Sequence, residues 1–237
     1  MNASLAIPSA WIAGATRTHR RLEGTVGALT EDDVRAPSAL PGWTRGHVIT
    51  HISRNAEAIG GMTEAAKRGE MRPMYPGGSD ERDRGIEAGA PRGVAELLAD
   101  LETAQRALEE TWASVPEHVW QTGTGYRLVG PATIADFVFI RWRESSIHSV
   151  DLAVPGVDPL DAWRSLEAGY LDEEWRWTTA GLAERVPEGT VLVLSPGDRP
   201  ARAYGKGPNV VVSHDPVPQA LAWLTGRADP PLPLAPW

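Results

Sequence analysis

The chain has 237 residues, of which 42% are hydrophobic, so it can build one large domain or two small ones around a substantial core. Its formal net charge of -8 argues against non-specific binding to nucleic acid or to anionic membranes. It contains no cysteine, which excludes disulfides, thiolate metal ligands and a cysteine nucleophile. No stretch has the length and composition of a membrane span, and no basic segment precedes the apolar N-terminal run, so we expect a cytoplasmic protein.

Apolar residues at helical spacing predict four long helices, which together are typical of a four-helix bundle. The predicted helices cover residues 9–29, 44–68 and 91–115 and a segment that begins at Pro131. Thr44 is the expected N-cap of the second helix. We expect His19 and Arg20 of the first helix, and His118 after the third, to face solvent. A short extended segment is expected at residues 126–129.

The connection over residues 69–89 is rich in Gly, Pro and charged residues, which predicts irregular structure over most of it. A loop of this length in a compact protein is either disordered or functional. A solvated linker is one interpretation. We favour a lid over a binding site, because the apolar Met74 and Tyr75 need cover, and Tyr75, Arg82 and Arg84 are its candidate contacts.

The pattern changes near Pro155, where short β-like runs replace the long helical stripes. A helix is expected over residues 158–184, and a closing helix over 217–225 with Gly226 as its cap. Extended segments are expected at residues 190–194, 201–204 and 210–212. We therefore predict a mainly α protein, with a four-helix bundle over residues 1–156 and a small α+β domain over 157–237.

Glu144 and His148 lie four residues apart in the fourth predicted helix, so their side chains share one face. Projection of that helix places both side chains beside Phe137, towards the apolar interior. A carboxylate there is costly unless it is paired or bound to a metal. The pair is therefore a candidate for half of a metal site built from nitrogen and oxygen ligands.

The second predicted helix carries His47 and His51, again four residues apart. His51 projects nearer the centre of the buried stripe, together with Asn55, whereas His47 lies at its edge. We therefore predict a metal site formed by His51, Glu144 and His148 on two facing helices, with His47 as the second choice for the histidine from the earlier helix. A satisfied core histidine and a surface Glu–His ion pair are the ordinary alternatives, because both spacings are short and frequent by chance.

Four segments, PGWTRGHVITHISRNA, PMY, RWRESSIHSVDL and LTGR, resemble the mycothiol-dependent maleylpyruvate isomerase family within the wider DinB-like metalloenzymes. The resemblance covers nearly the whole chain and implies a DinB-like four-helix bundle followed by an α+β part. It also implies a divalent metal, usually zinc, on His51, Glu144 and His148. The arginine of that family that is implicated in catalysis falls on Arg227, for which a charge near a helix end is the alternative interpretation.

The resemblance implies mycothiol as the thiol cosubstrate, since the chain itself has none. Three protein ligands leave a metal position open, at which a thiol can deprotonate. The thiolate would add to the double bond of maleylpyruvate, the bond would rotate, and elimination would release fumarylpyruvate. The substrate carboxylates and the developing enolate need cationic partners, for which Arg82, Arg84 and Arg227 are candidates. Asn55 and Tyr75 are further candidate contacts, and Asp151 could orient His148.

Two other functions fit the same residues. A mycothiol S-transferase would use the same metal and thiol but keep the adduct with an electrophile. A non-catalytic metal-binding module would close its coordination sphere, with His47 as the natural fourth ligand. In every case the expected partners are small molecules, with no nucleic acid and no membrane, and we favour a monomer.

Overall fold

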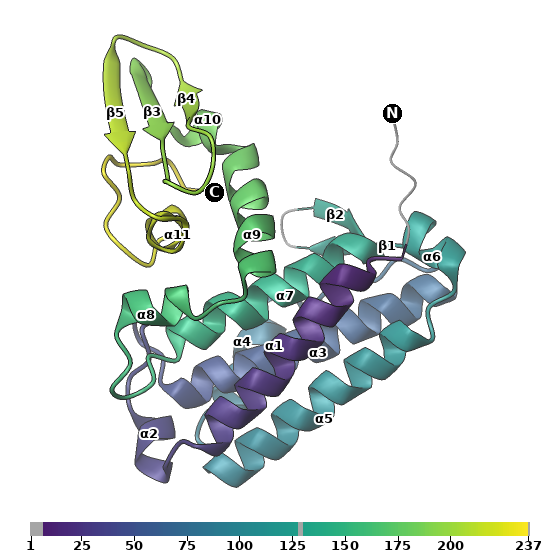
Figure 1. Ribbon diagram of the computed structural model, residues 1–237. Coiled ribbons are helices and arrows are strands. Elements are labelled where there is room, and N and C mark those ends of the chain that lie inside the picture. The colour runs from purple at the N-terminus through teal and green to yellow at the C-terminus, as the bar shows by residue number, and fades with distance from the viewer. Residues whose placement is uncertain (1–6, 128–129, 237) are drawn as a thin grey trace. The chain divides into compact units, whose positions relative to one another are not determined.

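The computed structural model describes residues 7–127 and 130–236 (Figure 1). The chain forms two compact units, a helical unit that ends at Pro155 and a C-terminal unit that begins at Gly156. The elements of the helical unit are α1 (Ser9–Gly27), α2 (Glu31–Arg35), α3 (Arg45–Lys67), α4 (Gly78–Gly89), α5 (Val94–Ala113), α6 (Glu117–Thr122), β1 (Thr124–Arg127), β2 (Gly130–Thr133) and α7 (Ile134–Asp151).

The four long helices α1, α3, α5 and α7 pack side by side, with α3 against α5 and α7, and α1 against α5 and α7 (Figure 1). Each contributes an apolar stripe at three- and four-residue spacing, such as Leu97, Leu101 and Leu108 of α5, all 1% exposed or less. Burial of each such side chain contributes about 1.5–3 kcal/mol to folding. The four-helix bundle expected from the sequence is therefore confirmed.

The helices α3 and α7 begin at capping threonines rather than at the prolines that precede them. Thr44 caps α3 as predicted, because its hydroxyl accepts the N–H of His47. By contrast, α7 does not begin at Pro131, which lies in β2 and pairs with Tyr126 of β1. The helix begins three residues later, where Thr133 caps the N–H of Asp136.

The third predicted helix also begins later than expected. It starts at Val94 rather than at Pro91, with Gly93 as its N-cap. The extended segment expected at residues 126–129 is partly realised by β1, while residues 128 and 129 lie outside the described residues. His118 is exposed as predicted, on the short helix α6.

The prediction of irregular structure over residues 69–89 was wrong for its second half. α4 occupies Gly78–Gly89 and packs against α3. Its sequence is strongly polar, but Ile86 is only 1% exposed and anchors the helix against the bundle. Tertiary burial of one face therefore stabilises a helix that local propensity does not favour.

The C-terminal unit contains four helices and a three-stranded sheet in its described part, residues 156–236. Its elements are α8 (Pro159–Arg164), α9 (Ala168–Ala180), α10 (Leu182–Arg185), β3 (Thr190–Leu194), β4 (Arg202–Gly205), β5 (Asn209–Ser213) and α11 (Val217–Leu224). β3 lies between β4, to which it is antiparallel, and β5, to which it is parallel. This arrangement agrees with the small α+β part expected from the sequence.

The single helix expected over residues 158–184 is interrupted twice. Glu167 is extended and separates α8 from α9, and Gly181 separates α9 from α10. The predicted cap at Gly226 is correct, since this glycine has a φ of 80°. Its N–H donates to the carbonyl of Trp223, and the N–H of Arg227 donates to the carbonyl of Ala222, which closes α11 as a Schellman motif.

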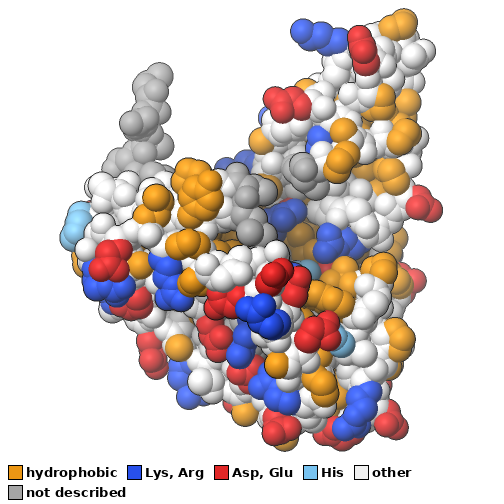
Figure 2. Space-filling view, turned by 180° about the vertical axis from the view of Figure 1, so that it is seen from behind, with side chains coloured by type: hydrophobic (Ala, Val, Ile, Leu, Met, Phe, Trp, Pro, Cys, Tyr) orange, Lys and Arg blue, Asp and Glu red, His pale blue; other side chains and the backbone are white. Residues whose placement is uncertain are grey.

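Acidic and basic side chains are interspersed over the face shown in Figure 2. Elsewhere in the described structure, several acidic and basic side chains pair with a residue three or four positions away in the same helix, such as Arg35 with Glu31 at 2.9 Å. Pairs of this kind contribute little to stability. Within the described residues, no helix combines the length and apolar character that crossing a membrane requires.

The contact between α1 and α7 leads to a first prediction. A Cβ atom on Gly14 would lie 2.4 Å from the indole ring of Trp142, so Gly14→Ala should lower the free energy of unfolding by about 1–3 kcal/mol through overpacking. Urea denaturation would measure this. Gly24→Ala, in the same helix with nothing within 4 Å, is the matched control and should raise stability by about 0.5–1 kcal/mol. Equal effects of the two substitutions would contradict the close contact.

Candidate metal centre

Two helices that are far apart in sequence bring three ligand atoms together. His51 projects from α3, and Glu144 and His148 project from α7. Nε2 of His51 lies 3.0 Å from Oε2 of Glu144 and 3.1 Å from Nε2 of His148. The third distance, from Nε2 of His148 to Oε2 of Glu144, is 3.4 Å. These three side chains, here called the triad, form a group that could hold a metal ion.

The geometry of the triad fits a tetrahedral metal. Zinc ligands at about 2.0–2.1 Å from the ion lie about 3.3 Å from one another in a tetrahedron. The three ligand atoms of the triad are separated by 3.0, 3.1 and 3.4 Å. Two imidazole nitrogens and one carboxylate are also a donor set typical of catalytic zinc, with a fourth position left for water or substrate. The residues therefore fit the group that the sequence predicted.

Asp151 fixes the orientation of one triad histidine. Its carboxylate is fully buried and lies 2.8 Å from Nδ1 of His148. A proton on Nδ1 leaves the lone pair of Nε2 directed at the other two ligands, as carboxylate–histidine pairs do in metal sites. Burial opposes protonation of His148, but the contacts with Asp151 and Glu144 outweigh it and raise the pKa of this imidazole.

The other two ligands differ in how they are held. Burial by itself would raise the pKa of Glu144, but its contacts with His148 and His51 hold the pKa well below its usual value, so the carboxylate is ionised. Burial lowers the pKa of His51, which favours the neutral, ligating form. Nδ1 of His51 is buried without a hydrogen-bond partner in the described structure. Its ring is positioned instead by packing, 4.6 Å from the ring of His148 and 5.6 Å from that of Trp43.

The chain that follows α3 supplies a tyrosine and an arginine beside the triad, Tyr75 before α4 and Arg82 on α4. Arg82 of α4 lies over the indole of Trp43, 5.6 Å from the ring centroid, and its charge contributes to lowering the pKa of His51. Burial raises the pKa of Tyr75 to about 12, against the opposing charge of Arg82. Tyr75 is therefore a neutral phenol at neutral pH and can donate a hydrogen bond.

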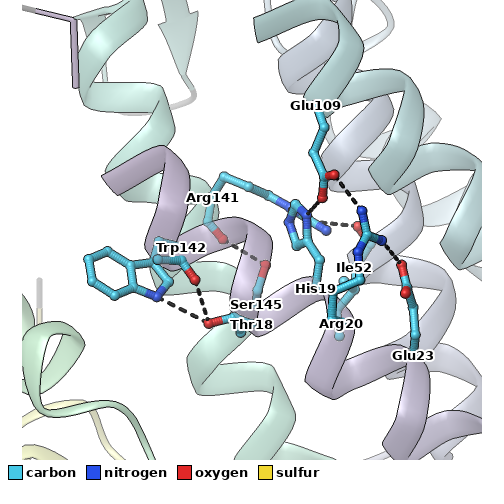
Figure 3. A network of polar contacts seen from close by, with 10 residues as sticks. Thr18, His19, Arg20, Glu23, Ile52, Glu109, Arg141, Trp142 and Ser145 are labelled. Carbon is cyan, nitrogen blue, oxygen red and sulfur yellow. Dashed lines mark hydrogen bonds and ion pairs between the residues drawn. The ribbon is translucent and has the colours of Figure 1, made fainter. Parts of the chain in front are cut away.

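A buried guanidinium, that of Arg141, belongs to the network of polar contacts drawn in Figure 3. Arg141 is 0% exposed and precedes Glu144 by one helical turn. Its Nη1 donates to the carbonyl of Ile52 at 2.7 Å and to Oδ1 of Asn55 at 3.0 Å, both on α3. Its Nε donates to Nε2 of His19 on α1 at 3.0 Å. One side chain thus joins the two helices of the triad to a third helix.

The predicted exposure of His19 was wrong, because this residue is 0% exposed. Since Nε2 of His19 accepts from Arg141, the proton must be on Nδ1, which lies 2.7 Å from Oε1 of Glu109 on α5. Arg20, at the surface, also contacts Glu109, at 2.5 Å, and continues the network to solvent (Figure 3). Burial, together with the charges of Arg141 and Arg20, lowers the pKa of His19 well below 6.5, so the imidazole is neutral.

The remaining sequence candidates lie in different places. His47 stacks on Trp43 but belongs to the cap of α3, where its Nδ1 lies 2.7 Å from the hydroxyl of Thr44. Asn55 is buried against Arg141.

The two remaining arginine candidates lie elsewhere. Arg84 is exposed on α4. Arg227 belongs to the C-terminal unit, where its Nη1 donates to the carbonyl of Thr225 at 2.7 Å.

Three residues were not predicted as site residues from the sequence, namely Arg141 and Trp43 near the triad and His19, which contacts Arg141. A signal was present for two of them. Arg141 precedes Glu144 by three residues and His148 by seven, so it lies on the same helical face. His19 lies on the stripe of Leu22, three residues away. Nothing in the local pattern indicated Trp43.

A four-helix bundle with a His/Glu/His group on facing helices defines a class, that of helical proteins with a candidate metal centre in the bundle. The model of one family, "Mycothiol maleylpyruvate isomerase N-terminal domain", matches residues 15–153, more than half of the chain. The chain belongs to this family. The first 14 residues and the part after residue 153 lie outside this match.

Two solved structures are similar to the chain over most of its length. One is a crystal structure of the mycothiol-dependent maleylpyruvate isomerase, with a TM-score of 0.80 and 21% identity, covering 96% of this chain and 91% of that chain. The other is a histidine-to-alanine mutant of the same enzyme, also with a TM-score of 0.80 and 21% identity, covering 93% and 90%. A search of curated proteins gave no match. The similarity to the solved structures shows a shared fold.

The geometry of the triad predicts which histidine is needed for metal binding. His51→Ala and Glu144→Gln should each reduce the metal content of the purified protein from about one ion per chain to a small fraction, because two ligands seldom hold an ion. His47→Ala is the control. It should retain the metal and lose about 1 kcal/mol of stability through the weakened cap. Elemental analysis measures the metal content, and its loss in His47→Ala alone would contradict the assignment.

The buried neutral state of His19 predicts a pH dependence of stability. Its folded pKa lies below the unfolded value of 6.5, so the unfolded chain binds more protons between these two values. The contribution of neutral His19 to the free energy of unfolding is therefore fully present above pH 6.5 and is lost as the pH falls below that value. His19→Gln keeps an amide donor and acceptor but cannot titrate. Urea unfolding between pH 8 and pH 5 should show a shallower loss of stability for this variant than for wild type, and parallel curves would contradict the prediction.

Proposed function

We propose that the protein is a metal- and mycothiol-dependent cis–trans isomerase that converts maleylpyruvate to fumarylpyruvate. The observation that carries this proposal is the convergence of the triad atoms within 3.4 Å of one another, in a chain of the maleylpyruvate isomerase family. Zinc is the metal that the donor set favours. The triad, with Asp151 behind His148, is the proposed metal site, and Tyr75 and Arg82 are its proposed neighbours on the substrate side.

The thiol has to come from outside the chain, because the sequence contains no cysteine. A divalent metal held by the triad would act as a Lewis acid that lowers the pKa of a thiol, so that thiolate is available near neutral pH. The chain's own contribution is to keep His51 neutral, Glu144 ionised and the proton of His148 on Nδ1, next to Asp151.

The charges around the triad favour anionic ligands. Glu144 and Asp151 are negative and Arg82 and Arg141 are positive, so these four groups balance one another. Tyr75 is neutral. A divalent ion then leaves positive charge that thiolate and substrate carboxylates can neutralise. Such a site selects anions over neutral molecules of the same size.

The proposed reaction needs no net consumption of thiol. The thiolate forms a bond to one alkene carbon of the substrate while the π bond breaks, and the electron pair is delocalised into the neighbouring carbonyl as an enolate. Rotation about the resulting single bond and expulsion of the same thiolate restore the double bond in the trans form. Tyr75 as a donor and Arg82 as a cation are suited to stabilise the enolate oxygen.

The non-catalytic alternative is disfavoured by the position of His47. Its Nδ1 is engaged with Thr44, and its Nε2 lies 3.5 Å from the exposed Glu87. His47 is not part of the metal-ligating group found among the described residues. The triad therefore keeps a position for an exchangeable ligand, which a purely structural metal site would not require.

The test is an assay of metal-loaded protein with maleylpyruvate, with and without mycothiol. We expect fumarylpyruvate to form only when mycothiol is present. An amount of mycothiol below that of the substrate should be enough, and it should be recovered unchanged. His51→Ala should lower kcat by at least about a hundredfold, because the metal is lost. His118→Ala, an exposed histidine on α6, should retain wild-type activity.

The same assay separates the isomerase from a mycothiol S-transferase. Mass spectrometry of the products distinguishes a released trans isomer from an accumulated thioether adduct. Accumulation of the adduct with stoichiometric loss of thiol would replace the isomerase by the transferase. Absence of both products from protein with a full metal content would refute both thiol-dependent functions.

A further inference from the structure

A pocket of about 210 Å³ opens in the helical unit between α3, residues 72–76 and α4. It is here called the arginine pocket, after the three arginines among its walls. The lining residues that bear on its chemistry are Arg54, Glu57, Arg72, Tyr75, Glu81 and Arg82. The pocket is smaller than the 300–1,000 Å³ of a typical pocket for a drug-sized ligand, so it suits a short charged group rather than a whole large molecule.

The arginine pocket adjoins the triad through two shared neighbours. Tyr75 and Arg82 line the pocket and also act on the triad, since the charge of Glu144 contributes to the raised pKa of Tyr75 and that of Arg82 to the lowered pKa of His51. Arg82 also covers Trp43, whose ring is 5.6 Å from that of His51. A ligand group in the pocket therefore lies next to the reacting position.

The charged groups of the pocket are unequally neutralised. Arg54 is paired with Asp100 at 2.5 Å and with Glu57 at 3.0 Å. The carboxylate of Glu81 accepts the N–H of Gly77 at 2.5 Å.

The other two arginines are available to a ligand. Arg82 lies over the Trp43 ring, and its ion pair is with the adjacent and exposed Asp83, a type of pair that is worth little. Within residues 7–127 and 130–236, Arg72 makes no ion pair with a carboxylate. Two guanidinium groups with a weak ion pair or none therefore line a pocket together with a neutral phenol.

The backbone and one glycine hold Arg72 in place. The carbonyl of Arg72 accepts the N–H of Tyr126 at 3.3 Å, and the N–H of Met74 donates to the carbonyl of Tyr126 at 2.9 Å, so this segment runs along β1. The guanidinium lies against α3 at Gly61, where an added Cβ atom would be 2.6 Å from Nη1 of Arg72. A glycine at this position of α3 gives the guanidinium room beside the helix.

We propose that the arginine pocket binds a carboxylate of the electrophile through Arg72 and Arg82, and that Arg72 is a specificity-determining residue for carboxylate-bearing substrates. This inference rests on the proposed function and assigns a substrate subsite to it. Planar guanidinium groups match the two oxygens of a carboxylate, and Tyr75 can donate a third hydrogen bond. A neutral electrophile would form no ion pair with either arginine and would therefore gain no affinity from the pocket.

Two variants test the proposal in different ways. Arg72→Gln removes the charge, whereas Gly61→Ala keeps Arg72 but displaces its guanidinium. Arg68→Gln is the matched control, an exposed arginine paired with Glu70 outside the pocket. Circular dichroism melts verify that each variant is folded. The probes are maleate, which carries two carboxylates, and its neutral dimethyl ester, titrated calorimetrically into metal-loaded protein.

We expect Arg72→Gln and Gly61→Ala to weaken maleate binding about 10- to 100-fold, the effect of a lost hydrogen bond to a charged group, and to leave binding of the ester unchanged. KM for maleylpyruvate should rise by a similar factor, with kcat within about twofold. Arg68→Gln should match wild type. Unchanged maleate affinity in both variants, or an equal loss for maleate and its ester, would overturn the proposal.

The failure of this inference can be distinguished from failure of the proposed function. An active isomerase whose KM is insensitive to Arg72→Gln would overturn the role of Arg72 and leave the isomerase intact. A protein without isomerase activity that still binds maleate through Arg72 would refute the function and retain the carboxylate subsite. Maleate that does not bind to wild type at all would refute the subsite.

Discussion

The guanidinium of Arg141 is the constraint on which the helical unit depends. It is completely buried, and its hydrogen bonds reach Ile52 and Asn55 on α3 and His19 on α1. A buried charge is costly unless it is well hydrogen-bonded, so these partners have to be in place whenever the helices pack. The relative positions of α3 and α7 are thereby restricted to those in which Nε and Nη1 of Arg141 meet their acceptors. The triad is built across the same two helices.

The triad shows how two packed helices can hold ligand groups at fixed distances. Histidine and carboxylate ligands on rigid helices can be held at separations close to those of a tetrahedral metal site, which a flexible loop would achieve less accurately. Asp151 behind His148 and Trp43 beside His51 fix the two rings by different means, one by a hydrogen bond and the other by packing. The groups that could select a substrate are Tyr75, in the connection between α3 and α4, and Arg82, on α4. The long helices α3 and α7 thus carry the proposed metal ligands, while the chain between α3 and the end of α4 carries the proposed specificity.

Much of the fold followed from periodicity and capping. The bundle, the start of α3 at Thr44 and the end of α11 at Gly226 all depend on neighbours within one or two helical turns, which the sequence displays directly. Two of the wrong predictions, those for α4 and for His19, share another cause. α4 is stabilised by burial of Ile86 against α3, and His19 is buried by partners on α5 and α7. These partners are 90 or more residues away for His19, so no local window contains them.

The sequence by itself determined the chemical limits of this protein. The lack of cysteine restricts metal ligands to nitrogen and oxygen, and four-residue spacings place His47 with His51, and Glu144 with His148, on common helical faces. The tertiary structure decided which histidine meets the carboxylate of Glu144 and which groups accept hydrogen bonds from the buried Arg141. It also decided that Arg72 lines a pocket next to the triad. The physical reason is that spacing defines the face of one helix, whereas the contacts of that face depend on segments brought together only by packing of the whole bundle.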